Sequence, residues 1–268
     1  MDSLELCGVR GMFNELRPIQ VLVDNQEIAT ENRIRVQGRA NMTLLPDFFL
    51  IDIYNLTDED MVKLRQAKKM LVYGEKSTLI CSGDIEGLYQ HEENSNDIIS
   101  VSVSDGMEFW KSTVNVTVGS GAWMKDVVRM ILKGASFGTF LCDNVRMPRG
   151  QTFSGKIADV IHTMAVSVRA RAYIFCETLF MVGKESPTNV VKIENEDVIA
   201  SPSGIENGLI LKTRVTGYEV GNVVEYERMK YRVITRAVDA DNYSGNWGSE
   251  ITLIREDIFI SDGMEGGF

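Results

Sequence analysis

The stretch from Asp47 to Asp60 constrains the fold most, because it joins an extended segment directly to the start of a helix. Its first eight residues read Asp-Phe-Phe-Leu-Ile-Asp-Ile-Tyr, so aromatic and β-branched side chains alternate between two faces, as in a strand. Thr57 then offers the side chain of a helix N-cap, and the three acids after it suit the positive end of a helix dipole. We therefore expect a strand that ends at Asn55 and leads into a short helix.

The charge balance narrows the class of protein. The 268 residues carry a net charge of −10, whereas binding to phosphates needs clustered lysine and arginine. The chain is a poor candidate for wrapping DNA, although an acidic wall would let DNA pass without sticking. No run of about 18 apolar residues is present, and Met1-Asp-Ser-Leu-Glu-Leu lacks the basic and apolar regions of a signal peptide. We expect no membrane anchor and a protein that is made and kept in a cytoplasm.

Strand-like patterns dominate both ends of the chain. Asp24-Asn25 supplies turn chemistry between two of these segments, and Gly83 and Gly87 predict bends or bulges in the longest one, as in a strongly curved sheet. The predicted strands span residues 19–23, 33–39, 47–55, 69–73, 79–90, 97–104, 209–215, 223–226, 230–237 and 249–255.

Helical patterns occupy the middle of the chain. After a strand at 114–118, apolar residues recur at helical spacing over 121–133, with Ser120 as a possible cap, and again over 154–170. A single strand is expected over 173–183. The predicted class is therefore α+β and mainly β. Two tube-like β-barrel or curved-sheet domains, residues 1–113 and 186–268, flank a small α+β domain with two helices, residues 114–185.

Metal and cofactor motifs are weak. Cys7, Cys81, Cys142 and Cys176 form no CxxC pair, and with only His91 and His162 available a zinc site would need ligands from three distant segments. We interpret the cysteines as reduced and partly buried.

A glycine motif follows the strand at 114–118. Gly119-Ser-Gly121 resembles the start of a dinucleotide loop, but the third glycine and the later acidic residue are missing, which favours a tight turn and helix cap.

Two groups of acidic residues could support catalysis or metal binding. Asp84 and Glu86 lie on one face of a strand, where carboxylates flanking a cleft could hydrolyse sugars, but nothing places these two in a cleft. Asp239, Asp241 and Glu250 match parts of a calcium loop, yet Tyr243 stands where an oxygen ligand is wanted and the flanks are predicted strands. Solvated strand surface and a polar hairpin loop are the favoured interpretations.

Aromatic and basic residues allow two further hypotheses. Trp110, Trp123 and Trp247 could stack on sugars, although Trp123 fits the buried stripe of its helix. A modest basic patch could also form from Lys125, Arg129, Lys133, Arg169 and Arg171, but such a face is usually solvated. We predict no catalytic, cofactor-binding or metal-binding residue and no enzyme activity.

Several short motifs, in order, resemble a known family. Phe48-Phe-Leu-Ile-Asp-Ile-Tyr-Asn-Leu-Thr resembles the strand and "N-L" junction of bacteriophage baseplate and tail hub proteins. The later matches are Ser82-Gly83-Asp84-Ile85, Val101-Ser-Val-Ser-Asp105-Gly106, Gly221-Asn-Val-Val224, Tyr231-Arg-Val233 and Gly245-Asn-Trp247. The resemblance covers about residues 10 to 256. It departs from the family at Val238-Asp-Ala-Asp, where the family often has His-x-Gly-Asp.

The resemblance implies a structural virion protein that is assembled in the bacterial host cytoplasm. Such hubs are homotrimers with two tube-like domains per chain, arranged as a pseudo-sixfold ring. The ring joins the sixfold tail tube to a threefold tail tip or spike and lines the DNA channel. The expected partners are the tail tube protein, a spike or tail-tip protein, the tape-measure protein, and DNA in transit. The chain shows no lysozyme or needle domain, so we expect any such activity on another chain.

Two alternatives stay open. A hexameric tail-tube or distal-tail ring protein would need six copies in place of three. A host-surface carbohydrate-binding module is the alternative of another class, and a wall hydrolase that uses Glu86 is a more distant one. Host, tail type, and phage versus tailocin are not readable from the residues.

Overall fold

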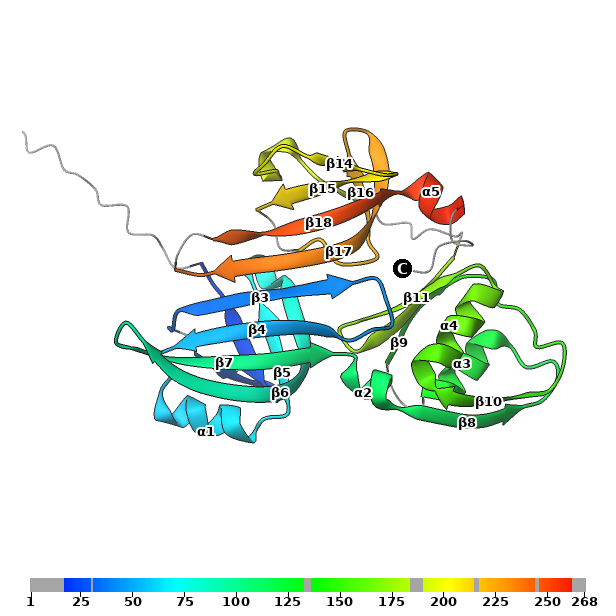
Figure 1. Ribbon diagram of the computed structural model, residues 1–268, viewed down its shortest axis with the longest axis horizontal. Helices are drawn as coiled ribbons and strands as arrows, with labels where there is room; N and C mark the ends of the chain where they lie inside the picture. Colours follow the sequence, from blue (N-terminus) through cyan, green and yellow to red (C-terminus); the bar gives the residue numbers. More distant parts are fainter. Residues whose placement is uncertain are drawn as a thin grey trace, which may run out of the picture.

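The computed structural model describes residues 17–29, 31–132, 136–183, 190–214, 217–243 and 246–261. Strands make up most of the regular structure, and most of the helices gather in a smaller part beside the main sheet (Figure 1). The predicted class, α+β and mainly β, is confirmed. Cys7, Lys133 and Gly245 lie outside the described residues, so the interpretations that involve them stay predictions. No helix in the described ranges is long and apolar enough to cross a membrane.

Thirteen strands form one large sheet that draws on both ends of the chain. Its main path has the order β14-β15-β18-β17-β3-β4-β7-β6-β5-β1-β2; β16 also pairs with β17, and β13 pairs with β16. The strands of this sheet are β1 (Gln20–Val23), β2 (Gln26–Ile28), β3 (Ile34–Asn41), β4 (Asp47–Tyr54), β5 (Lys69–Tyr73), β6 (Leu79–Glu93), β7 (Asn96–Asp105), β13 (Val190–Lys192), β14 (Ser203–Ile205), β15 (Gly208–Thr213), β16 (Val223–Tyr226), β17 (Met229–Asp241) and β18 (Trp247–Arg255). Short 3-10 turns, Glu75–Ser77 and Asn195–Asp197, lie between them.

Strand β17 joins the two ends of the chain. It pairs antiparallel with β3, from Thr235 opposite Asn41 to Asp241 opposite Arg35, so N-terminal and C-terminal strands share one surface (Figure 1). Among the described strands the sheet does not close on itself. Of the two predicted forms, barrel or curved sheet, the structure therefore has the open sheet. The domain boundaries after residues 113 and 185 stay our proposal.

The strand-to-helix stretch forms as predicted. In β4, Phe49, Ile51 and Ile53 are buried while the residues between them are exposed or half-buried. Helix α1 (Asp58–Gln66) follows, and the Thr57 hydroxyl accepts a hydrogen bond from the Asp60 amide. The inward side chains of β4 join those of β1, β3, β5 and β7 in the largest buried cluster of the described residues. This face of the sheet is therefore the core.

The longest strand carries the predicted irregularity. The pairing of β6 with β7 shifts between Ile85 and Gly87, which is a bulge next to the glycine that predicted one.

The smaller part packs two helices on short strands. It contains β8 (Thr113–Val118), β9 (Ser136–Leu141), β10 (Gln151–Lys156), β11 (Arg171–Phe175) and β12 (Thr178–Val182), with α2 (Met107–Lys111), α3 (Met124–Leu132) and α4 (Ile157–Ser167). Strand β8 pairs with β10, and β12 pairs with β9 and β11. Neither β9 nor β10 was predicted, because neither has a clean alternating pattern.

Three local predictions in this part are wrong. The predicted strand over 173–183 is a hairpin, because Cys176 and Glu177 adopt positive φ angles of 50° and 56° and turn the chain between β11 and β12. Helix α3 starts three residues later than expected. Its first backbone hydrogen bonds, from the amides of Asp126 and Val127, go to the Trp123 carbonyl, so Ser120 is not its cap. Residues 154–156, expected to open α4, belong to β10 because they pair with β8.

The β11–β12 hairpin forms a shared wall between the smaller part and the large sheet. Tyr173 and Phe175 pack into the core of the sheet, whereas Ile174 and Leu179 pack against the helices. At the other side, α5 (Glu256–Ser261) places Phe259 between the guanidinium groups of Arg171 (4.6 Å) and Arg232 (4.8 Å). The smaller part is thus held to the sheet on two sides.

Gly221 gives a test of this attachment. Its φ is +85°, and an added Cβ would collide with the Tyr173 hydroxyl. We expect Gly221→Ala to lower the free energy of unfolding by about 2–4 kcal/mol, because backbone strain and overpacking add. Denaturant unfolding measures this. Gly204→Ala is the matched control, since no atom lies within 4 Å of its added Cβ. Equal stability of the two variants would contradict the close packing of Tyr173 on Gly221.

Candidate functional site

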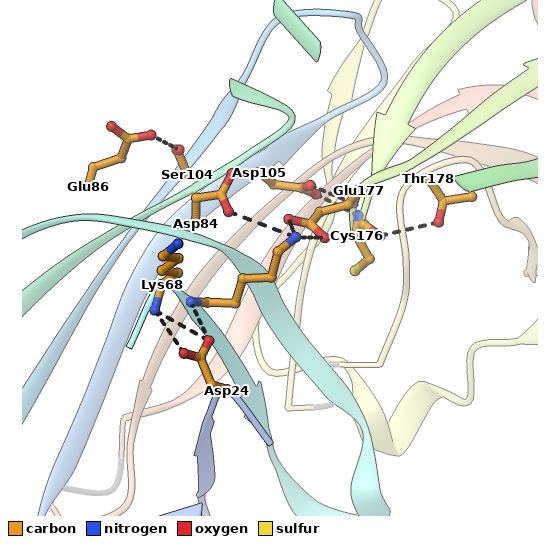
Figure 2. Close-up of polar contacts among 10 residues, drawn as sticks. Asp24, Lys68, Asp84, Glu86, Ser104, Asp105, Cys176, Glu177 and Thr178 are labelled. Atoms are coloured by element: carbon orange, nitrogen blue, oxygen red, sulfur yellow. Dashed lines mark hydrogen bonds and ion pairs between the residues drawn. The ribbon is translucent and has the colours of Figure 1, made fainter. Parts of the chain in front are cut away.

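The two carboxylates considered for catalysis, Asp84 and Glu86, contact different partners. Asp84 lies 3.8 Å from the Lys69 ammonium, whereas Glu86 accepts a 2.7 Å hydrogen bond from the Ser104 hydroxyl (Figure 2). Glu86 is the extra residue of the bulge in β6, where the register shifts between Ile85 and Gly87. Each acid has its own partner, so this geometry gives no pair poised for acid–base chemistry.

The acids of the suggested calcium loop are bound by arginines. Arg33 donates to Asp241 at 2.6 Å and 3.3 Å, and Arg35 lies 3.4 Å from Asp239. The hydrogen bond to Asp241 raises the pKa of Arg33 above its ordinary value. Guanidinium groups therefore occupy the positions that a cation would take, and the loop residues 244–245 lie outside the described ranges.

The three cysteines in the described ranges, Cys81, Cys142 and Cys176, are free thiols. Burial raises the pKa of the Cys142 and Cys176 thiols to about 12, and Cys81 is shifted the same way. The described part of the chain contains no group of three or more cysteine, histidine and acidic side chains that could hold an ion.

Gly119-Ser-Gly121 follows β8, which pairs antiparallel with β10. It therefore does not open a βαβ nucleotide unit.

Cations cover the tryptophan rings that were considered for sugar stacking. Arg146 lies 4.6 Å from the Trp123 ring and Lys156 lies 4.8 Å from Trp110. Trp123 is 41% exposed, contrary to the buried position that we predicted in its helix stripe. Trp247 is buried, with Arg17 5.5 Å from its ring.

The predicted basic patch is divided between separate contacts. Arg129 pairs with Asp126 at 3.8 Å, Lys125 lies 5.8 Å from the Phe140 ring, and Arg171 lies against Phe259.

A group of buried polar residues, which we call the seam and did not predict from the sequence, links the N-terminal strands, the β11–β12 hairpin and β17. The Asp105 carboxylate at the end of β7 accepts hydrogen bonds from the amides of Cys176 (2.5 Å) and Glu177 (2.7 Å) in the β11–β12 turn (Figure 2). Asp47 lies directly opposite Asp105 on β4, and its carboxylate accepts bonds from Asn41. Arg236 of β17, fully buried, donates to the Ile80 carbonyl and stacks 5.8 Å from Phe175.

Burial shifts the titration of the two acids of the seam. It raises the pKa of Asp47 to about 7, and the nearby Asp105 adds to this, whereas the hydrogen bonds from Asn41 oppose it. Burial likewise raises the pKa of Asp105 to about 6 against the hydrogen bonds from Glu177 and Cys176. The two carboxyl groups therefore hydrogen-bond neighbouring chain segments, and their raised pKa values lie near neutral pH.

The face of the large sheet opposite the core forms a continuous surface, which we call the outer face. The strand register places one row of it across six strands: Lys212, Glu250, Ala237, Arg39, Phe48 and Ser104, of which Ser104 is buried. The next row is Gly248, Asp239, Gln37, Leu50, Ser102 and Gly87. Figure 1 shows these strands side by side, with α1 and the smaller part at the margins. One polar surface thus spans strands from both ends of the chain.

Positive charge on the outer face is largely balanced. Besides the two arginine–aspartate pairs above, Lys212 lies 3.5 Å from Glu250, whereas the exposed Arg39 forms no ion pair within the described residues. Asp52 accepts a 2.6 Å hydrogen bond from the Ser100 hydroxyl. Strand β7 presents the short, uncharged side chains of Ser100 and Ser102 to this face. Phe48, Leu50 and Tyr89 are exposed hydrophobic side chains here, 55%, 38% and 67% exposed. Such a face offers little for a polyanion to bind.

Comparisons with known proteins identify the fold. A tail protein from Neisseria meningitidis matches 92% of this chain and 98% of its own, with a TM-score of 0.64 at 11% identity. The 43 kDa tail protein of prophage MuSo2 from Shewanella oneidensis matches 91% of this chain and 98% of its own, with a TM-score of 0.64 at 10% identity. A component of the E. coli type VI secretion system, described as similar to bacteriophage T4 tail proteins, matches 92% of this chain and 75% of its own, with a TM-score of 0.57 at 11% identity.

The chain therefore has the fold of phage tail proteins, and the resemblance inferred from its motifs is confirmed at the level of fold. No protein-family model matches the sequence. No curated protein matches it either.

Proposed function

We propose that the chain is a structural, non-enzymatic subunit of the baseplate hub of a phage-type tail. Three copies would form a pseudo-sixfold ring that joins the sixfold tail tube to a threefold tip or spike. Tail-tube, tape-measure and tip proteins would be its neighbours, and it would be assembled in the bacterial cytoplasm. The fold shared with tail proteins supports a tail component.

One observation carries the finer proposal. Each chain contributes strands from its two ends to one continuous sheet through the β3–β17 pairing. Three such chains would present six strand groups, which is what a threefold ring needs to match a sixfold tube.

The outer face is our candidate for the channel lining. Three of its cations, Arg33, Arg35 and Lys212, have carboxylate partners at 2.6–3.5 Å, and the whole chain is acidic. DNA passing along such a wall would find few unpaired charges, so transit would not become binding.

Cryo-electron microscopy of the intact tail tip tests the proposal. We expect a ring of three copies around an open channel, with Gln37 and Ser102 facing that channel. A ring of six copies would replace the hub by the tail-tube or distal-tail alternative. A monomer in the particle, or a ring without a central opening, would rule out both.

Thiol labelling of assembled particles gives a matched check on the orientation of the sheet. A bulky maleimide should label Glu59→Cys on α1 readily and Ser102→Cys on the outer face at least about tenfold more slowly. In the isolated chain both positions are exposed and should label alike. Equal labelling in the particle would show that the outer face does not line an enclosed channel.

A further inference from the structure

The distal half of β6 is an open sheet edge. Strand β5 pairs with β6 only from Leu79 to Asp84, whereas β7 continues along β6 to Glu93. Among the described strands, the stretch from Gly87 to Glu93 therefore has a neighbour on one side only. It contains neither proline nor lysine, the residues that commonly protect edges. Leu88 and Tyr89 are 38% and 67% exposed on it.

A second open edge lies at the opposite end of the same sheet. Strand β14 ends the main path, pairs only with β15 among the described strands, and has all three residues exposed. It carries no charge, and Ile205 offers an exposed apolar side chain. The other end of the main path, β2, is bounded by α1, where Asp60 accepts a hydrogen bond from the Ala29 amide next to the strand.

We infer that these two edges meet between copies, so that the distal half of β6 in one chain pairs with β14 of the next chain. This inference rests on the proposed ring. A contact between two different edges of the same sheet is heterologous, and such contacts satisfy every copy only when they close into a ring. Main-chain hydrogen bonds across the edge would supply affinity, and Tyr89 would pack beside Ile205 because both side chains lie on the outer face, whereas Leu88 lies on the opposite face of β6.

Charge favours this pairing over an acidic partner strand. Glu92 and Glu93 end the β6 edge, and like charges placed opposite each other destabilise a strand pair. The neutral Ser203-Gly-Ile205 edge avoids that repulsion. The outer face would then continue from chain to chain without a gap.

Cysteine cross-linking in assembled particles tests the inference. In Gln90→Cys/Gly204→Cys particles, or in Tyr89→Cys/Gly204→Cys for the neighbouring register, oxidation should give a ladder that stops at three linked chains. The control pair Gln90→Cys/Glu59→Cys and the unmodified chain should give none. A ladder in the controls, or none in either test pair, would overturn the inference.

A second variant tests the edge without cross-linking. Leu88→Lys should lower the yield of rings by about tenfold, whereas Val62→Lys, a change at another exposed apolar residue on α1, should not. Normal ring yield with Leu88→Lys would contradict the inference. Three-copy rings that neither cross-link nor respond to Leu88→Lys would leave the hub function standing and remove only this contact, whereas absence of any ring would remove the function itself.

Discussion

Replacing Glu256 by alanine is expected to lower the free energy of unfolding by about 3–5 kcal/mol, because it leaves a buried guanidinium without its counter-charge. Arg232 is 0% exposed and donates to both Glu256 carboxylate oxygens, at 2.9 Å and 2.5 Å. Its remaining nitrogen donates to the Gly221 carbonyl at 2.8 Å. Urea unfolding followed by circular dichroism would measure the loss.

A neighbouring ion pair, between the end of β18 and the start of α5, provides the control. Arg255 and Asp257 are joined at 2.6 Å and 3.1 Å, but both side chains are largely exposed to water. Water replaces the lost partner there, so Asp257→Ala should leave stability almost unchanged. If both variants lost the same stability, the buried position of Arg232 would not be the cause.

The second large effect is a pH dependence that originates at Asp47. Its pKa in the folded chain is raised to about 7 by burial. A carboxyl group with a raised folded pKa stabilises the fold fully below its unfolded pKa, and this stabilisation is lost as the pH rises through the folded pKa. We therefore expect the contribution of Asp47 to fall between about pH 4 and pH 7, by at most about 4 kcal/mol.

The measurement is the free energy of unfolding from pH 4 to pH 8 for the parent chain and for Asp47→Asn. The variant keeps a carbonyl that can accept from Asn41 but has no proton to lose, so its stability should fall less steeply with pH. Asp105, raised to about 6, adds a smaller slope of the same sign and remains in both proteins. Glu206→Gln in an exposed turn should leave the slope unchanged. A parent and an Asp47→Asn variant with identical slopes would contradict this assignment.

Local patterns were sufficient wherever neighbours in sequence decide the structure. The strand from Asp47 and its capped helix form as predicted because alternation and an N-cap act over a few residues. The Asp24-Asn25 turn is confirmed with φ angles of 45° and 65°. The motif order that suggested a tail protein is matched by the fold.

The alternation of the strands could have predicted some of the buried charged residues, but we did not predict any of them. Asp47 and Asp105 occur in phase with the inward residues of their strands, so alternation alone placed them in the core. Arg232 and Arg236 had no such clear signal, because a bulge shifts the register of β17 between Val233 and Thr235. The turn at Cys176-Glu177 lacks glycine and proline, so the hairpin of β11 and β12 was taken for one strand.

The amino-acid sequence by itself determined the strand and helix periodicities, most turns, the acidic balance and the resemblance to tail hubs. Only the tertiary structure decided that β3 pairs with β17, about two hundred residues away, and that among the described strands the sheet stays open with free edges at β6 and β14. Alternation says which side of a strand is buried but not which strand lies beside it. The strand partners follow from how the three buried hydrophobic clusters of the described residues, and the buried charges, pack together. The proposed ring depends on that strand pairing.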